Sequence, residues 1–452
     1  MLKVFLQRYQ QRQLLLILGD ILIIIVTLSL ILLLDAYGEK SSPKDLRKYV
    51  GIIATFCAIT IIVLYILNLF DISKPNGYGF KFLLICIGML IVTVIYSALS
   101  YLLISLRPGK INLLLFALTT GILTYLWHNT FHKLVKTNVQ RILFIGNEKI
   151  FDDISQFITD NYSQYYTIVG HWHRHSHNPT LPNLLNFIEN NNADLVVYSV
   201  HSKVLKQVIN DLITIKFSKR NIINAYNFYQ LLNLKYPVYY LDDFWLLVNA
   251  QKEIFFPTAA GRLKRSIDLF VVLLFLPPAV VLFLIAALAI KLESKGPVFF
   301  IQERLGQDEV PFRLYKLRTM IDNAESLNGP QWAVEGDWRI TRVGKVLRKL
   351  RLDELPQLVN ILKGEMSLVG PRPIRQHFTE ILAKEIPFYK LRLLVKPGLT
   401  GWAQVNSGHA HTNEGHSQVL QYDLFYLINQ SLWFDLFILC KTFKVMVWGK
   451  GT

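Results

Sequence analysis

The sequence predicts a membrane protein built from a membrane α region, an α/β domain and a mainly α C-terminal domain. Four long apolar runs predict four transmembrane helices within residues 1–130, and alternating strand and helix patterns predict a Rossmann-like α/β domain over 131–250. A fifth apolar run, interrupted by two prolines, lies near the start of residues 251–452 and predicts a re-entrant membrane helix, with interfacial helices elsewhere in this third domain.

The composition combines a high apolar content with a strong positive charge. Of the 452 residues, 52% are hydrophobic and 18% are charged, which excludes a disordered chain and argues against a wholly soluble enzyme. Lys and Arg outnumber Asp and Glu by 48 to 32, so the net charge is +16. This excess predicts anionic partners at a membrane, either phospholipid headgroups or phosphorylated substrates. Charge alone would also suit nucleic acid, but the basic groups surround apolar segments, so we expect no nucleic-acid partner.

The three cysteines exclude two further classes of protein. Cys57, Cys86 and Cys440 each lie inside an apolar stretch and far from one another in the sequence. This spacing excludes a disulfide framework and a thiolate zinc site.

The apolar runs at the start of the chain are 13–34, 50–70, 82–105 and 111–127. Each has about the 20 residues that a helix needs to cross roughly 30 Å of hydrocarbon. Core helices of a soluble protein are the alternative, but four successive runs with short polar links favour membrane spans. An even number of spans places both ends on one side, and the flanking Lys and Arg residues weakly favour the cytoplasm.

Strand and helix patterns alternate in the middle of the chain, as in a doubly wound parallel sheet. The predicted strands are 141–146, 165–169, 193–200 and 221–225, and the predicted helices are 149–161, 181–190 and 202–217. The first strand-to-helix turn reads Gly146-Asn147-Glu148-Lys149-Ile150, without the Gly-x-Gly-x-x-Gly of dinucleotide-binding domains. We therefore expect a scaffold or dimerisation domain.

A cluster of alternating histidines follows the second predicted strand. His171, His173, His175 and His177 would share one face and could bind a metal if the strand continued. A solvated loop is the alternative, because Asn178-Pro179 ends the segment.

Residues 266–292 are apolar and long enough to span, but Pro277 and Pro278 lie near their middle. Two prolines remove two backbone donors and clash with the preceding turn, so a sharp break is expected. Basic residues flank both ends, and a broken helix that enters and returns keeps both groups on one face of the membrane. The sequence therefore predicts a re-entrant hairpin, with a kinked spanning helix as the alternative.

Two carboxylates and a series of cations mark the chemistry of the C-terminal domain. Alternation along a predicted strand at 312–318 places Lys316 and Arg318 on one face. Six basic residues then lead into Asp353-Glu354: Arg339, Arg342, Lys345, Arg348, Lys349 and Arg351. A helix predicted at 356–364 puts this acid pair at a helix N-terminus, where the two carboxylates could share Mg²⁺, or one could attack phosphorus while the other holds the metal.

One more guanidinium group is presented by the stiff turn Gly370-Pro371-Arg372-Pro373, in a form suited to bidentate phosphate contact. Solvated faces, capping and salt bridges are the alternatives for these charged groups.

These motifs resemble those of the bacterial sugar transferases, the monotopic phosphoglycosyl transferases of the polyprenyl-phosphate hexose-1-phosphate type. The resembling stretches are 294–300, 315–320, 352–357 (LDELPQ), 366–373 (MSLVGPRP) and 396–406 (KPGLTGWAQVN). The predicted spans and Rossmann-like domain are similar to those of long-form members. Two departures are Leu276 in place of the serine of the usual Ser-Pro break, and Ser407-Gly408-His409 in place of a Gly-Arg after Asn406.

The resemblance implies a reaction at the cytoplasmic face of the bacterial inner membrane. Asp353 would attack the β-phosphate of a UDP-sugar, usually UDP-glucose or UDP-galactose, and release UMP. Undecaprenyl phosphate would then take the sugar phosphate from the enzyme, as the first membrane step of exopolysaccharide, capsule or O-antigen synthesis. Glu354, with Asp353, would bind Mg²⁺, and four residues would support phosphate, nucleotide or the site: Lys316, Arg348, Gln357 and Arg372.

The resemblance also implies a homodimer. The residues leave two alternative functions open: a non-catalytic membrane scaffold of a glycan assembly complex, and a direct glycosyl transfer that leaves UDP.

A C-terminal stretch over 422–448 mixes aromatic residues with lysines and suits an interfacial helix, with a plain core helix as the alternative.

Overall fold

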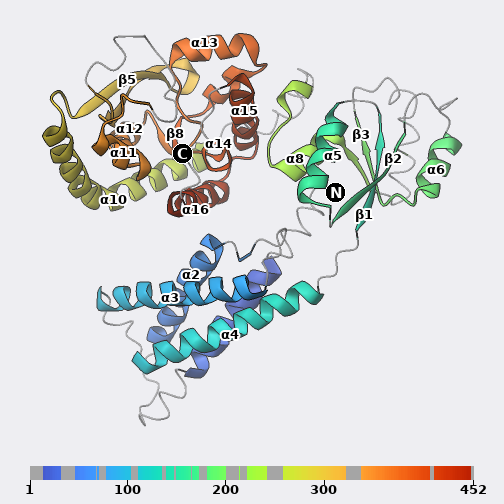
Figure 1. The fold of residues 1–452 in the computed structure, drawn as a ribbon, viewed down its shortest axis with the longest axis horizontal. Coiled ribbons are helices and arrows are strands. Elements are labelled where there is room, and N and C mark those ends of the chain that lie inside the picture. Colours follow the sequence, from blue (N-terminus) through green and yellow to red (C-terminus); the bar gives the residue numbers. More distant parts are fainter. Residues whose placement is uncertain are drawn as a thin grey trace. The chain divides into compact units, whose positions relative to one another are not determined.

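The computed structural model of the chain divides into two compact units, Met1–Leu231 and Leu232–Thr452. It is mostly helical and contains a smaller share of parallel sheet (Figure 1). The described residues are 14–31, 46–67, 69–70, 78–102, 110–134, 139–146, 149–163, 165–172, 181–199, 213, 221–241, 258–321, 337–407 and 412–448. The division into three domains at 1–130, 131–250 and 251–452 stays a prediction.

Helices occupy all four apolar runs at the start of the chain. They are Leu14–Ile31, α2 (Leu46–Ile66), α3 (Tyr78–Leu102) and α4 (Lys110–Leu134). Within the described residues, three helical segments are long and apolar enough to cross a membrane: Leu14–Ile31, Lys81–Leu99 and Ala260–Glu293. The apolar part of α2, Val50–Ile66, is shorter. The chain is thus membrane-associated, and four spans in this region remain a prediction.

Polar side chains join helix Leu14–Ile31 to α4. Asp20 Oδ2 lies 2.9 Å from His128 Nε2, and both side chains are fully buried. The hydroxyls of Thr27 and Thr120 lie 2.9 Å apart on the same two helices. Because a polar group is costly in an apolar environment unless it has a partner, these two pairs favour a single register between the helices.

A parallel sheet forms the core of the predicted Rossmann-like region. Its elements in chain order are β1 (Gln140–Ile145), α5 (Ile150–Asn161), β2 (Tyr166–Trp172), α6 (Leu181–Asn190), β3 (Leu195–Tyr198), β4 (Asn221–Asn224) and α8 (Ala225–Asn233). The strand order is β2-β1-β3-β4, and all three pairings are parallel. The predicted parallel sheet is therefore confirmed, whereas the helix predicted at 202–217 lies outside the described residues except for Ile213.

The histidine cluster is only partly within the described residues. His171 belongs to β2, and its ring packs 4.8 Å from that of Phe144. His173, His175 and His177 lie outside the described residues, so metal binding there stays a prediction.

The second unit packs most of its short strands and helices around a large apolar core, and Ala286, Ile290, Leu317 and Leu347 form a smaller cluster. It contains η2 (Val238–Tyr240), α10 (Thr258–Glu293), β5 (Phe299–Leu305), η3 (Gln307–Glu309), β6 (Pro311–Leu317), α11 (Arg342–Lys349), η4 (Leu352–Glu354), α12 (Gln357–Lys363), β7 (Ser367–Val369), α13 (Gln376–Glu385), η5 (Tyr389–Leu394), β8 (Gly398–Thr400), α14 (Trp402–Asn406), α15 (Asn413–Ile428) and α16 (Leu432–Trp448). Strands β5 and β6 pair antiparallel, and β7 and β8 pair parallel. The core includes Ile361, Met366, Trp402, Leu420 and Ile438.

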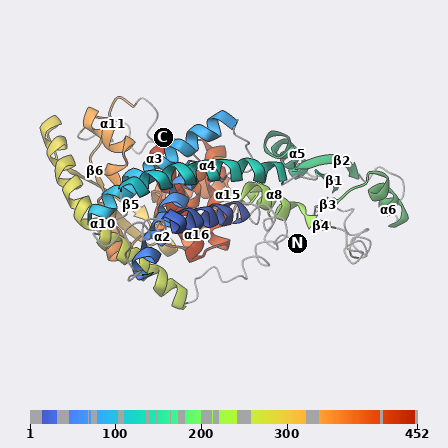
Figure 2. The ribbon, with the colours of Figure 1, turned by 90° about the horizontal axis from the view of Figure 1, so that it is seen from below.

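The long helix α10 is continuous through Pro277 and Pro278. The helix extends over 36 residues, so the two prolines do not end it, and the ribbon changes direction along its length (Figures 1 and 2). The re-entrant hairpin stays a prediction. Loss of two backbone donors bends a helix without ending it when the flanking turns remain bonded. Apolar side chains such as Phe270, Leu284 and Leu288 are exposed along α10, as a lipid-facing helix requires.

The buried pair between Asp20 and His128 leads to a first prediction. Replacing Asp20 alone by Leu should lower the free energy of unfolding by about 1–3 kcal/mol, because His128 then lacks its partner. The double variant Asp20→Leu, His128→Phe should recover part of this loss, since two apolar groups need no partner. Thermal unfolding in detergent measures both effects, and a double variant less stable than Asp20→Leu would contradict the pairing.

Candidate functional site

The acid pair Asp353-Glu354 lies in a single 3₁₀ turn, η4, between two helices. Arg351, just before this turn, has φ 55°, in the left-handed region that non-glycine residues seldom adopt. Pro356 then precedes α12. Both acids are buried, with 8% of each residue exposed. The sequence placed the pair at a helix N-terminus, and the structure puts it in the turn immediately before that helix.

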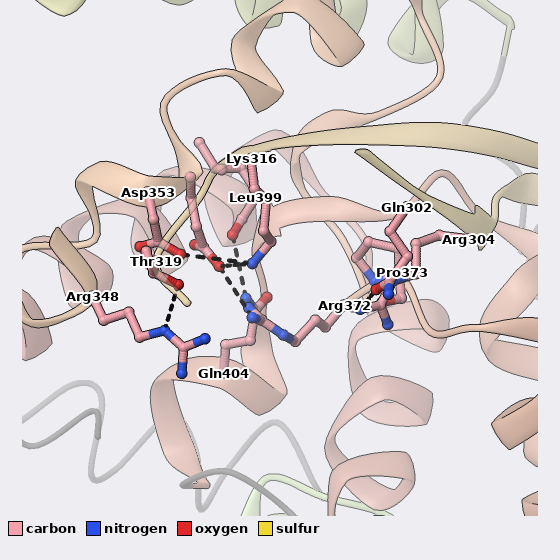
Figure 3. Close-up of polar contacts among 11 residues, drawn as sticks. Gln302, Arg304, Lys316, Thr319, Arg348, Asp353, Arg372, Pro373, Leu399 and Gln404 are labelled. Atoms are coloured by element: carbon pink, nitrogen blue, oxygen red, sulfur yellow. Dashed lines mark hydrogen bonds and ion pairs between the residues drawn. The ribbon is translucent and has the colours of Figure 1, made fainter. Parts of the chain in front are cut away.

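Two cations contact a single oxygen of Glu354. Lys316 Nζ, from β6, and Arg372 Nη2, from the loop after β7, each lie 3.0 Å from Glu354 Oε1. Both cations are labelled in Figure 3. Burial alone would raise the pKa of Glu354, but the charges of Lys316 and Arg372 outweigh it and hold the pKa well below its usual range. Glu354 is therefore ionised at neutral pH and holds both cations in place.

Asp353 is neutralised less closely than its neighbour. Its Oδ2 lies 4.0 Å from Lys316 Nζ, beyond hydrogen-bond distance. Burial raises the pKa of Asp353, Lys316 opposes this shift, and the negative charge of Glu354 adds to it. A buried carboxylate with raised pKa and loose pairing is more basic than an exposed one, which suits a nucleophile or a proton acceptor.

Arg348 approaches the acid pair from α11. Its Nε donates a hydrogen bond of 2.8 Å to the hydroxyl oxygen Oγ1 of Thr319, a residue just after β6 (Figure 3). The helix can lie this close because residue 344 is glycine: a Cβ there would lie 2.0 Å from the carbonyl oxygen of Thr319. The charge of Arg348 favours ionisation of Asp353, so the two groups interact electrostatically. Thr319 was missed from the sequence, although it lies within the stretch 315–320.

Arg318 lies apart from this cluster. Its terminal nitrogens donate to the carbonyl oxygens of Ser294 and Lys295, each at 2.9 Å, and so bind the chain just after α10. Strand alternation predicted that Lys316 and Arg318 share one face, but it could not predict which group each side chain contacts. Gln357 is buried at the first turn of α12, beside the acid pair in sequence.

The loop that carries Arg372 is fixed by close backbone packing against the start of β8. A Cβ at Gly370 would lie 2.3 Å from the carbonyl oxygen of Lys396, and one at Gly398 would lie 2.1 Å from the amide of Gly370. Both positions therefore require glycine. Arg392 also donates to the carbonyl oxygen of Arg372 at 3.2 Å and pairs with Asp423 at 2.7 Å. Sequence reasoning missed Arg392, which no motif near it marked.

The acid pair offers a limited donor set for a divalent cation. Within the described residues, no three His, Cys, Asp or Glu side chains converge as a metal site. Mg²⁺ often uses only one or two carboxylates and completes its shell with substrate phosphates and water. Asp353 and Glu354 fit that mode, because only one Glu354 oxygen contacts the two cations.

Comparison with known proteins places the second unit among sugar transferases. Residues 259–449 match the family model for bacterial sugar transferases. The chain is similar to UDP-N-acetylgalactosamine-undecaprenyl-phosphate N-acetylgalactosaminephosphotransferase of Aeromonas hydrophila, with 47% identity over 189 residues. The aligned residues make up 42% of this chain and 44% of that protein.

Two further relatives are matched over a larger share of their own length. UDP-glucose:undecaprenyl-phosphate glucose-1-phosphate transferase of Caulobacter vibrioides is 45% identical over 181 residues, 40% of this chain and 67% of that protein. An uncharacterised sugar transferase of Bacillus subtilis is 40% identical over 191 residues, 42% of this chain and 89% of that protein. In each case less than half of the present chain is matched.

The contacts of Glu354 lead to a prediction about acid stability. Glu354→Gln should lower the free energy of unfolding by about 1–3 kcal/mol at neutral pH, because Lys316 and Arg372 lose their shared counter-charge. The pKa of Glu354 is lower in the folded state than its ordinary value of 4.5, so its contribution is present above that value and is lost as the pH falls.

Unfolding midpoints of the two proteins should therefore converge on acidification. Asp308→Asn, an exposed acid in η3, is the matched control and should follow the wild type. A constant difference between wild type and Glu354→Gln from about pH 7 to about pH 3 would contradict the assignment of a depressed pKa.

Proposed function

The chain belongs to the bacterial sugar transferase family, and on that premise we propose that it transfers a sugar 1-phosphate from a UDP-sugar to undecaprenyl phosphate. The products are undecaprenyl-diphosphate sugar and UMP. One observation carries this proposal: a buried acid pair in which two cations hold Glu354 while Asp353 lies 4.0 Å from its nearest cation contact. The names of the Aeromonas and Caulobacter relatives support the same two substrate classes.

In the first step, Asp353 acts as the nucleophile. A carboxylate oxygen forms a bond to the β-phosphorus of the UDP-sugar, the bond from that phosphorus to the bridging oxygen breaks, and UMP leaves with the electron pair. The sugar phosphate is then an acyl phosphate on Asp353. In the second step, an oxygen of undecaprenyl phosphate attacks the same phosphorus, and the Asp353 carboxylate is released unchanged.

The surrounding cations supply charge neutralisation and orientation. Lys316 of β6 and Arg372 of the loop after β7 contact Glu354 directly. Arg348 of α11 is bound to Thr319, and its charge favours ionisation of Asp353. Phosphoryl transfer needs positioning and stabilisation of negative charge more than any other contribution. Glu354 keeps Lys316 and Arg372 at the site before substrate arrives. We assign Arg318 and Gln357 supporting roles, the first through the chain after α10 and the second through α12.

Asp353 and Glu354 are also the residues that would hold Mg²⁺. Bound there, the ion would neutralise charge on the diphosphate. UDP-glucose, UDP-galactose and UDP-N-acetylgalactosamine are the donors to test first, because the relatives differ in the sugar that they are named for.

We propose that the reaction takes place at the cytoplasmic face of the bacterial inner membrane and begins the synthesis of a surface glycan. Four transmembrane helices would anchor the first unit, and α10 would enter and leave the membrane on one side. Exposed apolar residues on α16 suit contact with the interface: Trp433, Leu436, Phe437, Phe443 and Met446. A homodimer follows from the same family resemblance.

Replacing the nucleophile tests the chemistry. Asp353→Asn keeps the shape of the side chain but removes its nucleophilic oxygen, so release of UMP from a UDP-sugar should fall by about 10³-fold or more. Asp308→Asn serves as the acid-to-amide control and should retain wild-type turnover.

Near-normal UMP release by Asp353→Asn would exclude Asp353 as the nucleophile. Release of UDP by the wild-type protein would instead indicate direct glycosyl transfer. No nucleotide release with any UDP-sugar would favour a scaffold.

The topology of α10 can be tested by labelling. Leu263 and Leu292 are exposed near its two ends, so each can be replaced by Cys in a variant that lacks Cys57, Cys86 and Cys440. A membrane-impermeant thiol reagent should label both positions in inverted membrane vesicles and neither in right-side-out vesicles. Labelling of the two positions from opposite sides would show a spanning helix and contradict the re-entrant proposal.

A further inference from the structure

The first turns of α10 contact the strand that leads to Arg372. Asp268 is buried, and its Oδ2 accepts a hydrogen bond from Ser367 Oγ at 2.8 Å. Its Oδ1 accepts a longer one from the Leu368 amide at 3.4 Å. Ser367 and Leu368 are the first two residues of β7. A buried carboxylate is costly to desolvate, so these two donors account for its position at this point of the fold.

Lys264, one turn earlier on the same face of α10, holds the end of that strand. Its Nζ donates to the carbonyl oxygen of Val369 at 3.3 Å and pairs with Asp435 of α16. Two side chains of α10 therefore contact all three residues of β7. Only Gly370 and Pro371 separate this strand from Arg372.

Arg265 binds the other element of the site. Its guanidinium group donates to the carbonyl oxygens of Ile361 and Leu362, the latter at 2.9 Å, in the last turn of α12. A cation at this end of a helix is favourable because the final carbonyl groups lack partners within the helix. The opposite end of α12 follows Asp353-Glu354. One short segment of α10 thus contacts both elements that bring Arg372 and Glu354 together.

We propose that Asp268 is a positioning residue, which acts through Ser367 and Leu368 to set Arg372 against Glu354. The seating of the membrane helix α10 on β7 thereby controls the two-cation contact on Glu354. This inference rests on the proposed transferase function. Asp268 itself touches neither the acid pair nor its cations in the contacts described here, so its effect on rate passes through the loop.

Removing this contact should displace the loop locally and leave the fold intact. Strand β7 keeps its bonds to the β8 segment, from the Ser367 amide to the Pro397 oxygen and from the Gly370 amide to the Thr400 oxygen, both 2.9 Å. In Asp268→Asn, the amide can accept from only one of the two donors, and its NH₂ group then faces the other donor. Arg372 should lose its fixed distance to Glu354, and misplacement of a charge-stabilising group lowers the rate of the chemical step more than substrate binding.

The test compares full-length wild type with Asp268→Asn, Ser367→Ala, Arg372→Lys and the double variant Asp268→Asn, Arg372→Lys. Ser266→Ala is the matched control, because Ser266 is exposed and its hydroxyl donates to the carbonyl oxygen of Arg262 in its own helix. We expect Asp268→Asn to lower kcat for UMP release about tenfold, with KM for the UDP-sugar changed by less than about twofold. Ser367→Ala should shift kcat in the same direction by a smaller factor, and Ser266→Ala should match the wild type.

The double variant separates positioning from general destabilisation. If Asp268 acts through Arg372, the double variant should turn over within about twofold of Arg372→Lys alone. Independent losses that multiply, or a rise in KM without loss of kcat, would overturn the proposal. If Asp268→Asn fails to fold, the single Ser367→Ala and its combination with Arg372→Lys provide the same comparison. Failure of the wild type to release UMP would contradict the proposed function itself, and so would be distinguishable from failure of this inference.

Discussion

The site depends on the contact of two cations with one carboxylate oxygen. Lys316 and Arg372 both lie 3.0 Å from Glu354 Oε1, although they come from elements that are far apart in the sequence. Burial would otherwise favour a neutral Glu354, so the ion cluster exists only because strand β6, turn η4 and the loop after β7 meet at one point. Its consequence is an asymmetry within the acid pair. Glu354 is held ionised, while Asp353 keeps a raised pKa and a looser contact.

The packing around that point is dictated by backbone approach as much as by side chains. Gly344 lets α11 bring Arg348 to Thr319, and Gly370 and Gly398 let the loop after β7 pack against the start of β8 through their backbones. Helix α10 also supports these elements, because Arg265 donates to α12 and Asp268 accepts from β7. The same helix exposes a long apolar surface beyond these first turns and is long and apolar enough to cross a membrane. Under the proposed transferase function, this apolar surface would be the side from which an acceptor with a lipid tail reaches the site.

Patterns with short periods could be read from the sequence, and contacts between distant segments could not. Alternating strands and helices predicted the parallel sheet, and the acid pair after a basic run marked the charged site in advance. Alternation also placed Lys316 and Arg318 on one face, yet one binds Glu354 and the other binds the carbonyl groups after α10. The charged group of such a long side chain can reach several different partners, and the tertiary structure determines which one it contacts. No local pattern in the sequence marked Asp268 or Arg392, because each contacts a residue far away in the chain. Asp268 accepts from a residue about 100 positions later, and Arg392 donates to one about 20 positions earlier. The two prolines predicted a disturbed helix, but the sequence alone could not say whether Pro277 and Pro278 would end α10 or only bend it.

The most direct test of the account is a search for the covalent sugar phosphate on Asp353. Purified protein incubated with a UDP-sugar, in the absence of undecaprenyl phosphate, should release about one equivalent of UMP per active protein, as expected for an intermediate that accumulates before the second step. Mass spectrometry should then find the added sugar phosphate on the peptide that contains Asp353, and addition of undecaprenyl phosphate should remove it. Turnover that leaves every carboxylate unmodified and begins only when both substrates are present would contradict the nucleophilic role of Asp353.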